Sequence, residues 1–416
     1  MSNSEKTYLK SLFEIAVKQA LPETCLPPYL DNIDVTDEVC VLGAGKAALQ
    51  MAKVAEHRFG DKCYGAVVTR YGYSRVTNIG RLKVLQASHP LPDQGSVDAA
   101  YELLKLAKAV PADVPVLFLI SGGGSALMCL PIEGLDLDEK IRVNKFLLAS
   151  GASIHEINTV RKHLSQVKGG KLAQAVSGEF ETFVISDVVG DDPGIIASGP
   201  TVAGHSTPTQ AIEILERYDY PQLYKLRNLL LSQKNDIKPL ESKSVTIIAN
   251  AKRSIDKAIE FAKKDGWSTE VLSYEQEGEA KLVARQHAAR AIKAVKEGRR
   301  VLLFSGGELT VTLNNSAGSG GPNQEYLLAL AIELQGQRGV CALACDTDGV
   351  DGNKDVAGGF IDSSTLRRAE ALSLDPIDML KNNQSFDFFN ALKDLIVTGP
   401  THTNVNDFRV LMVSPS

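Results

Sequence analysis

The chain of 416 residues has little of three features that mark specialised proteins: paired cysteines, long apolar runs and excess positive charge. Its six cysteines include no C-x-x-C pair and no zinc-like cluster with histidine, which predicts free thiols in a reducing compartment. The longest apolar run, residues 114–120, is far shorter than the roughly 18 residues of a membrane-spanning helix. The first ten residues are charged and resemble no signal peptide. We therefore expect a cytoplasmic protein with no membrane partner.

The charge balance argues against a second class of partner. Forty-five basic and fifty acidic residues give a formal net charge of −5. Nonspecific nucleic-acid binding depends on a basic surface field, so we expect no nucleic-acid partner and a local site for any bound anion. The length predicts two to three domains at about 150 residues each.

The first half alternates short apolar runs with helical patterns. Runs at 39–42, 65–69, 114–120 and 183–185 each lead into a turn or loop, and an amphipathic helix is expected at 7–21. Nearly continuous apolar strands of this kind predict a parallel sheet covered by helices on both faces. Ligands of such α/β folds gather at the carboxyl ends of the strands.

A polar segment without periodicity, 231–244, is the expected domain boundary. We predict an N-terminal domain at 1–240 and a smaller C-terminal α/β domain at 241–416, with the active site in the cleft between them. The second domain is expected to contain strands at 245–249, 301–304 and 340–345 and helices at 254–265, 278–297, 323–334 and 364–372.

Two glycine-rich turns follow predicted strands. Gly43, Gly45 and Lys46 open a helix and favour an anion site, although a dinucleotide site or a purely structural turn stays open. A dinucleotide site is weakened because the next strand ends in Arg70, which could tolerate NADP, where an acidic residue would hold a ribose. The second turn, 121–125, can point backbone N–H groups at a phosphate or carboxylate; its candidate residues are Ser121, Gly122, Gly123 and Ser125.

A similar glycine-rich turn is expected in the second half, where Gly306, Gly307 and Glu308 follow a strand. The segment 158–171 gathers basic residues, including Arg161 and Lys168, around a Gly-Gly pair, which indicates a polyanionic ligand unless this face is simply solvated. Two acidic loops, 186–193 and 346–352, suit Mg²⁺, which takes one or two carboxylates and leaves room for phosphate. Ordinary Asp-Gly turns are the alternative for both loops. Ser88 and His89 precede a Pro-Leu-Pro stretch and offer polar groups for a substrate.

In combination, these motifs resemble the glycerate 2-kinases of the MOFRL type, whose members are also labelled hydroxypyruvate reductase. The resemblance spans nearly the whole chain in the expected order. It rests on the segments 43–47, 87–93, 121–125, 158–165, 168–170, 186–193, 198–201, 320–325, 346–352 and 399–407. The chain departs from the family at Pro322, where an arginine is frequent, so Lys46, Arg161 or Lys168 would have to bind the phosphate.

The resemblance implies a Rossmann-like N-terminal domain and phosphorylation of D-glycerate at its 2-hydroxyl, with ATP and Mg²⁺ as cofactors. Lys46 and Arg161 would contact phosphoryl oxygens or the substrate carboxylate, and Asp187 and Asp348 are candidates for metal ligand or general base. Glu308 and Glu325 are the next metal candidates. The expected substrate-binding residues are Ser88, His89, Ser121, Gly122, Gly123, Ser125 and Lys168. The expected cofactor-binding residues are Gly43, Gly45, Gly306, Gly307, Glu308, Asn323, Glu325, Thr401 and Asn404.

The residues favour a kinase over the alternatives. Phosphoryl transfer needs cations, backbone N–H groups that bind phosphate oxygens, and carboxylates that hold a metal on the phosphates. This chain has candidates for all three. An NAD(P)H-dependent hydroxypyruvate reductase would need a nicotinamide site, and a noncatalytic metabolite-binding regulator would not need two acidic loops. The sequence leaves open which carboxylate is the base and whether the chain forms a homo-oligomer.

Overall fold

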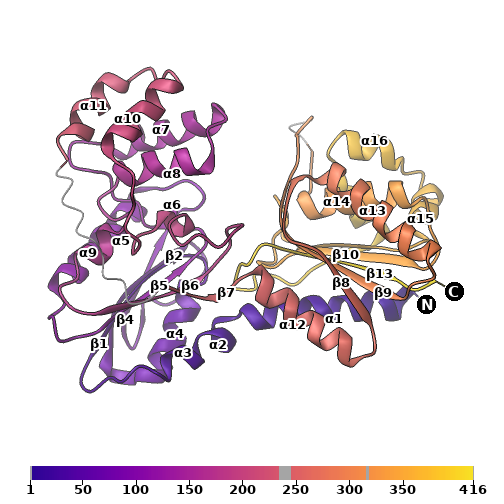
Figure 1. The fold of residues 1–416 in the computed structure, drawn as a ribbon, viewed down its shortest axis with the longest axis horizontal. Helices are drawn as coiled ribbons and strands as arrows, with labels where there is room; N and C mark the ends of the chain where they lie inside the picture. Colours follow the sequence, from indigo (N-terminus) through magenta and orange to yellow (C-terminus); the bar gives the residue numbers. More distant parts are fainter. Residues whose placement is uncertain (1, 234–244, 315–317, 416) are drawn as a thin grey trace. The chain divides into compact units, whose positions relative to one another are not determined.

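The computed structural model describes residues 2–233, 245–314 and 318–415, which form two compact units (Figure 1). The large unit comprises Pro22–Ile248, and the small unit comprises Met1–Leu21 together with Ala249–Ser416. Each unit has its own sheet covered by helices, which confirms the predicted two-domain α/β class.

The large unit contains a seven-stranded sheet in the order β3-β4-β2-β1-β5-β6-β7. Four of its pairings, β1 with β2, β1 with β5, β2 with β4 and β5 with β6, are parallel, whereas β3 runs antiparallel to β4. The central strands are entirely buried because helices cover both faces, which explains their unbroken apolar sequences. The strands are β1 (Val39–Ala44), β2 (Cys63–Arg70), β3 (Asn78–Ile79), β4 (Arg81–Ala87), β5 (Val116–Ser121), β6 (Phe180–Ile185) and β7 (Val245–Ala249).

The order of these strands creates a switch point. After β1 the chain builds β2 and β4 on one side, and it then crosses to place β5 on the other side of β1. The loops that follow β1 and β5 therefore diverge at the carboxyl edge of the sheet, where ligands of α/β folds bind.

The helices of the large unit form two groups. The first group packs on the sheet or on the helices that cover it and comprises α2 (Pro22–Cys25), α3 (Pro27–Leu30), α4 (Ala48–Phe59), α5 (Gln94–Ala109), α6 (Gly124–Leu127) and α9 (Lys171–Gln174). The second group shares a separate apolar core and comprises α7 (Leu137–Ala149), α8 (Ile154–His163), α10 (Pro208–Arg217) and α11 (Leu223–Leu231). Figure 1 shows this second group stacked beyond the sheet within the large unit.

The small unit contains a six-stranded mixed sheet in the order β12-β11-β10-β13-β9-β8, in which only β8 and β9 are parallel. Its strands are β8 (Ser268–Glu279), β9 (Val301–Thr310), β10 (Val340–Asp346), β11 (Gly358–Ile361), β12 (Leu395–Ile396) and β13 (Asp407–Val413). Its helices are α1 (Ser2–Ala20), α12 (Ala251–Lys264), α13 (Ala280–Lys296), α14 (Pro322–Leu334), α15 (Thr365–Ala371), α16 (Pro376–Lys381) and α17 (Ser385–Leu392).

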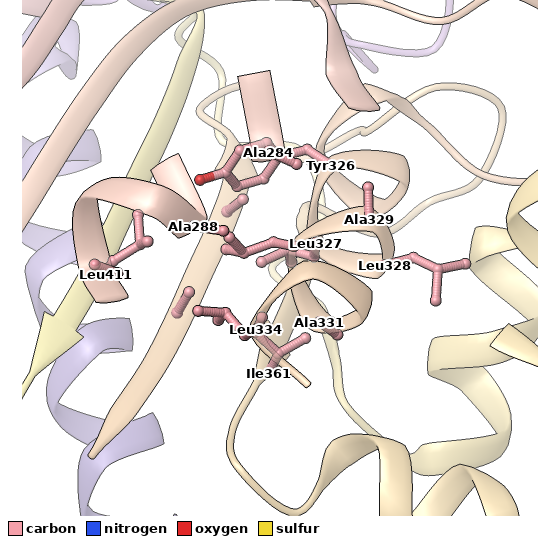
Figure 2. Close-up of a cluster of buried hydrophobic side chains, with 14 of the residues drawn as sticks. Ala284, Ala288, Tyr326, Leu327, Leu328, Ala329, Ala331, Leu334, Ile361 and Leu411 are labelled. Carbon is pink, nitrogen blue, oxygen red and sulfur yellow. The ribbon is translucent and has the colours of Figure 1, made fainter. Parts of the chain in front are cut away.

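Alternate residues of this sheet enter two separate cores. Leu303 of β9 packs with α13 and α14, whereas its neighbours Leu302 and Phe304 pack with α1 and α12. Figure 2 shows Leu327 of α14 on the side of Ala288 in α13, whereas Leu328 points to the opposite side of the helix. A helix buried on most sides needs apolar residues on most sides, and α14 is apolar without a break from Tyr326 to Ile332.

The large unit begins and ends at other residues than the predicted N-terminal domain at 1–240. Helix α1, predicted in the N-terminal domain, packs its residues Leu9, Leu12, Phe13 and Ala16 on the sheet of the small unit. Strand β7, predicted in the C-terminal domain, is the edge strand beside β6 in the large unit. The predicted boundary at 240 lies outside the described residues.

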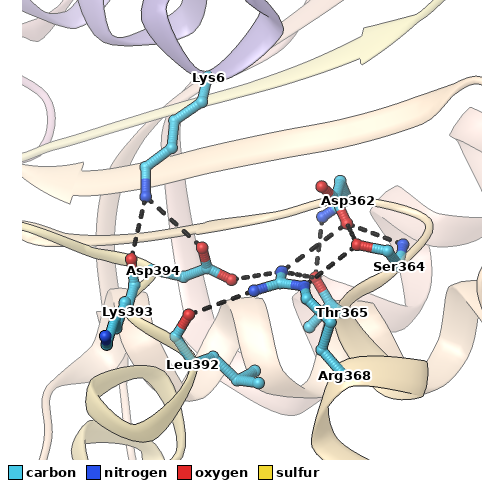
Figure 3. Close-up of polar contacts among 8 residues, drawn as sticks. All are labelled: Lys6, Asp362, Ser364, Thr365, Arg368, Leu392, Lys393 and Asp394. Atoms are coloured by element: carbon cyan, nitrogen blue, oxygen red, sulfur yellow. Dashed lines mark hydrogen bonds and ion pairs between the residues drawn. The ribbon is translucent and has the colours of Figure 1, made fainter. Parts of the chain in front are cut away.

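Polar contacts also attach α1 to the small unit (Figure 3). Lys6 donates to the backbone carbonyl of Lys393 at 3.3 Å and pairs with Asp394 at 3.5 Å. Asp394 in turn accepts a 2.5 Å hydrogen bond from Arg368 of α15. One buried carboxylate thus connects the first helix to α15.

Across the described ranges, no helix combines the length and apolar character that a membrane crossing requires.

Replacing Phe13 with Ala tests the assignment of α1. We expect the free energy of unfolding of the small unit to fall by about 3–5 kcal/mol, because a buried aromatic ring is lost from the core. Trp267, the only tryptophan of the chain, stacks on Tyr8 of α1, so its fluorescence during urea unfolding reports this unit. The exposed Lys18→Ala is the control, within about 0.5 kcal/mol of the parent. An unchanged tryptophan transition in the Phe13 variant would contradict the assignment.

Candidate functional site

The loops that follow β1 and β5 are bonded to each other at the switch point. The backbone N–H of Lys46 donates to the carbonyl of Gly122 at 2.8 Å, and that of Ala47 donates to Ser121 Oγ at 3.0 Å. A β-carbon at Gly45 would lie 2.0 Å from Ser121 Oγ, so only glycine allows the loops to approach this closely. The first helical turn of α4 begins just beyond this contact. Lys46 is therefore held at a helix start, as the sequence predicted.

Two further glycines bring predicted site residues together. A β-carbon at Gly122 would lie 1.8 Å from Oδ2 of Asp187, and one at Gly123 would lie 3.0 Å from the His89 ring and 3.4 Å from Cγ of Lys46. Lys46, His89 and Asp187 come from the loops after β1, β4 and β6. They therefore surround the glycine loop at one edge of the sheet.

A cavity of about 380 Å³ lies beside this loop within the large unit. Its lining comes from the loops after β4 and β5 and from the helices α7 and α8. The lining residues include His89, Gly123 and Ser125, all predicted for substrate binding, together with Arg161 and Lys168. Ser88 is partly exposed, and its N–H donates to Asp93, which caps α5, so it positions the start of that helix.

The lining of this cavity carries positive charge and no carboxylate. It contains Lys140, Lys145, Arg161 and Lys168 but no aspartate or glutamate. Helix α8 begins at a capping box between Ser153 and Glu156, which fixes the helix that presents Arg161. A cavity with this charge pattern favours an anionic ligand.

Lys168 is buried and already fully hydrogen-bonded. Its Nζ donates to the Ser125 carbonyl at 2.7 Å, to Ser125 Oγ at 3.1 Å and to the Met128 carbonyl at 3.2 Å. Ser125 Oγ lies 2.9 Å from Ser198 Oγ, which donates to Asn158. Lys168 thus shapes the glycine loop. Burial, followed by the repulsion of Lys140, lowers the pKa of Lys168 to about 7.

Arg161 and Lys140 complete the cationic wall. Arg161 Nε donates to Asn144 Oδ1 at 3.2 Å, and burial lowers the pKa of its guanidinium. Sequence reasoning missed Lys140, which is 1% exposed on α7. The available signal was its place three and seven residues before the buried Val143 and Leu147, on the apolar face of the helix.

Of the acidic residues in the loop after β6, Asp187 lies against the glycine loop. Asp192 accepts a 2.7 Å hydrogen bond from the N–H of Gly194 and is exposed. Among the described residues, no three His, Cys, Asp or Glu side chains gather as a metal cage. A carboxylate such as Asp187 nevertheless fits Mg²⁺ that is bound mainly by waters and substrate phosphates.

The small unit holds its predicted residues around the start of α14. Asp351 accepts hydrogen bonds from the backbone N–H groups of Asn323 at 3.0 Å and Gln324 at 2.9 Å. Asn323 also donates to Asp407, which pairs with the buried Arg409. Burial raises the pKa of Asp351 to about 7. Sequence reasoning did not select Asp351 or Arg409, because nothing local distinguishes them from the other residues of their loop and strand.

The remaining predicted residues of this unit lie in nearby turns. Asp348 Oδ1 accepts from the Val350 N–H at 2.8 Å, and its carbonyl accepts from the Thr401 N–H at 3.1 Å. Asn404 accepts from the N–H of Asn406. Pro322 is the first residue of α14, a position that favours proline over residues with an N–H group.

The prediction of a turn at 305–308 is wrong. Gly306, Gly307 and Glu308 lie within β9, and Gly307 and Glu308 pair with Gln276 and Glu277 of β8, so this segment continues the strand instead of turning. A β-carbon at Gly307 would lie 2.3 Å from the backbone of Gln276, so this glycine serves the close approach of two strands. Glu325 is buried in α14 and pairs with Lys281 at 2.9 Å, and burial raises its pKa.

Comparisons with known proteins agree with this architecture. Residues 8–230 match the family described as "Domain of unknown function (DUF4147)", and residues 301–407 match the MOFRL family. A protein of Agrobacterium vitis named "Putative hydroxypyruvate reductase" is 42% identical, over 90% of this chain and 98% of that protein. The D-glycerate 2-kinase of Thermotoga maritima is 39% identical over 96% of each chain. A crystal structure of glycerate kinase from Thermotoga maritima matches with a TM-score of 0.91 at 36% identity, covering 99% of this chain and all of that one.

The depressed pKa of Lys168 predicts a pH dependence of stability. In the unfolded chain its pKa is near 10.4, so unfolding takes up a proton between about pH 7 and 10, and stability gains up to about 1.4 kcal/mol per pH unit there. Lys168→Met removes this gain, although it also loses three hydrogen bonds. Calorimetric unfolding of parent and variant from pH 6.5 to 9.5 measures the difference in slope. The exposed Lys108→Met should retain the parental slope, and an equal slope in Lys168→Met would refute the prediction.

Proposed function

Because the chain belongs to the glycerate kinase family built from DUF4147 and MOFRL domains, we propose that it phosphorylates D-glycerate at the 2-hydroxyl with ATP, giving 2-phosphoglycerate. The observation that carries this proposal is the cavity beside the glycine loop. Its lining is cationic and free of carboxylates, and it lies at the strand edge where Lys46, His89 and Asp187 gather. An acid with a hydroxyl to be phosphorylated suits such a site.

The side chains of this edge provide what phosphoryl transfer needs. The reaction requires positioning and stabilisation of charge on the transferred oxygens more than covalent chemistry. Lys46, at the start of α4, would contact those oxygens, and Arg161 would contact them or the substrate carboxylate. The N–H groups of 121–125 would hold the acid in the orientation that exposes its hydroxyl.

A carboxylate near the glycine loop would accept the proton of the substrate hydroxyl or bind the metal. Asp187 lies against Gly122 and is our candidate for accepting the hydroxyl proton or for binding metal, and Asp348 is the second candidate for either role. Mg²⁺, when bound with the nucleotide, would neutralise phosphate charge at one of these carboxylates. Our candidates for nucleotide binding are Gly43 and Gly45 in the large unit and Asn323, Thr401 and Asn404 in the small unit.

We further propose that the enzyme works in the cytoplasm, because all six cysteines are free and buried in the described chain.

The assay that tests the function compares two reactions of the purified protein. We expect D-glycerate with ATP and Mg²⁺ to give 2-phosphoglycerate, identified by phosphorus NMR, and hydroxypyruvate with NADH or NADPH to give no hydride transfer. EDTA should abolish the kinase reaction and excess Mg²⁺ should restore it. Asp187→Asn or Asp348→Asn, whichever residue binds the metal, should raise the Mg²⁺ requirement and lower kcat together. Chelator-insensitive oxidation of the nicotinamide without phosphoglycerate would show a reductase instead.

Replacing Lys46 with Ala should lower kcat/KM at least about 10²-fold, a loss of roughly 2.7 kcal/mol of transition-state stabilisation. The fold should survive, because the side chain is partly exposed and the variant keeps the backbone N–H that bonds to Gly122. Lys53→Ala, at an exposed lysine of the helix α4 that follows Lys46, is the matched control and should keep parental turnover. Steady-state kinetics that leave the Lys46 variant near the parent would assign that lysine a structural role only.

A further inference from the structure

Lys140 is a buried cation that has no oxygen acceptor among the described residues. The residue is 1% exposed, and its Nζ is buried with no hydrogen-bond partner in the described part of the chain. It lines the cavity beside the glycine loop. The thiol of Cys129, a weak acceptor, lies near it and only partly offsets burial, which lowers the pKa of Lys140. Burying an unpaired ammonium costs stability, so the fold alone gives no reason for a lysine here.

Two of the other three cations of the cavity, Lys168 and Arg161, have oxygen acceptors that Lys140 lacks. Lys168 uses its three N–H groups on Ser125 and Met128, and Arg161 donates to Asn144. The lining contributes no carboxylate, and no ion pair to Lys140 occurs within the described ranges. The acceptor that Lys140 requires must therefore come with the ligand.

We infer that Lys140 binds the carboxylate of the acid substrate and so determines the preference of the enzyme for acids over uncharged polyols. The inference rests on the proposed function for the identity of that acid. The nucleotide must reach the substrate hydroxyl that is phosphorylated, so this part of the site has to be open. Lys46, our candidate for contacting the phosphoryl oxygens, is partly exposed. A fully enclosed ammonium suits the end of the substrate that does not react. A desolvated carboxylate–ammonium pair also discriminates strongly, because an uncharged analogue would leave the ammonium unpaired.

The test measures substrate preference and stability in the same variants. In Lys140→Met we expect the ratio of kcat/KM for D-glycerate to that for glycerol to fall at least about 30-fold. This fall should come mainly from a higher KM for D-glycerate, with the KM for ATP unchanged. The thermal midpoint should equal or exceed that of the parent, because the unpaired charge is gone. Lys140→Arg should recover part of the preference, and the exposed Lys108→Met should match the parent.

Calorimetric titration with D-glycerate, without nucleotide, separates this inference from the proposed function. Binding by the parent that weakens at least 30-fold in Lys140→Met supports the inference even if no phosphorylation occurs, an outcome that would refute the kinase proposal alone. A parental acid-to-glycerol ratio or parental binding in Lys140→Met overturns the inference and leaves the kinase intact. Lys140→Gln replaces the Met variant if the latter does not fold. A parent that neither binds nor phosphorylates D-glycerate overturns both.

Discussion

The candidate site depends on the contact between the loops that follow β1 and β5. Ser121 Oγ and the Gly122 carbonyl accept hydrogen bonds from the first residues of the α4 turn, and Gly45 leaves the space that this contact needs. The bulk of any side chain at Gly122 or Gly123 would displace Asp187 or His89. Four strand-end loops thus share one close-packed junction. A small shift in that junction would move the candidate phosphate-binding lysine and the candidate base together.

Charge is distributed unevenly around this junction. The cavity wall formed by α7 and α8 is cationic, whereas the carboxylate that approaches the glycine loop comes from the loop after β6. Burial disfavours the charged forms of Lys140, Arg161 and Lys168 and so lowers the pKa of each side chain. A bound anion would relieve this cost, so part of the binding free energy comes from the destabilised empty site.

Sequence patterns predicted local structure well where one segment supplies the whole signal. The strands β1, β2, β5 and β6 and the helices α12, α13 and α14 lie within a few residues of the expected ranges, because periodicity and bounding glycines are local properties. The motif residues Lys46, His89, Gly123 and Asp187 were expected in one site, and they do converge.

Properties that depend on distant partners were not predictable in this way. The pattern of α1 identifies an amphipathic helix but not which sheet it covers, and the same holds for β7. The glycines at 306 and 307 resemble a turn, yet they accommodate a neighbouring strand. Lys140 lies among Asp138, Glu139 and Arg142, so it resembles a solvated charge until α8 and the glycine loop enclose it.

The attachment of α1 to the small unit has a consequence for folding during synthesis. Helix α1 ends at Ala20, but the first strand of the sheet that it covers begins at Ser268. At roughly 5–20 residues per second, the ribosome exposes the apolar face of α1 for on the order of tens of seconds before that sheet exists. The large unit can complete its own sheet during that interval, whereas the small unit must wait for β13 at the end of the chain. The apolar face of α1 therefore stays uncovered in the nascent chain until the strands of the small unit have been synthesised.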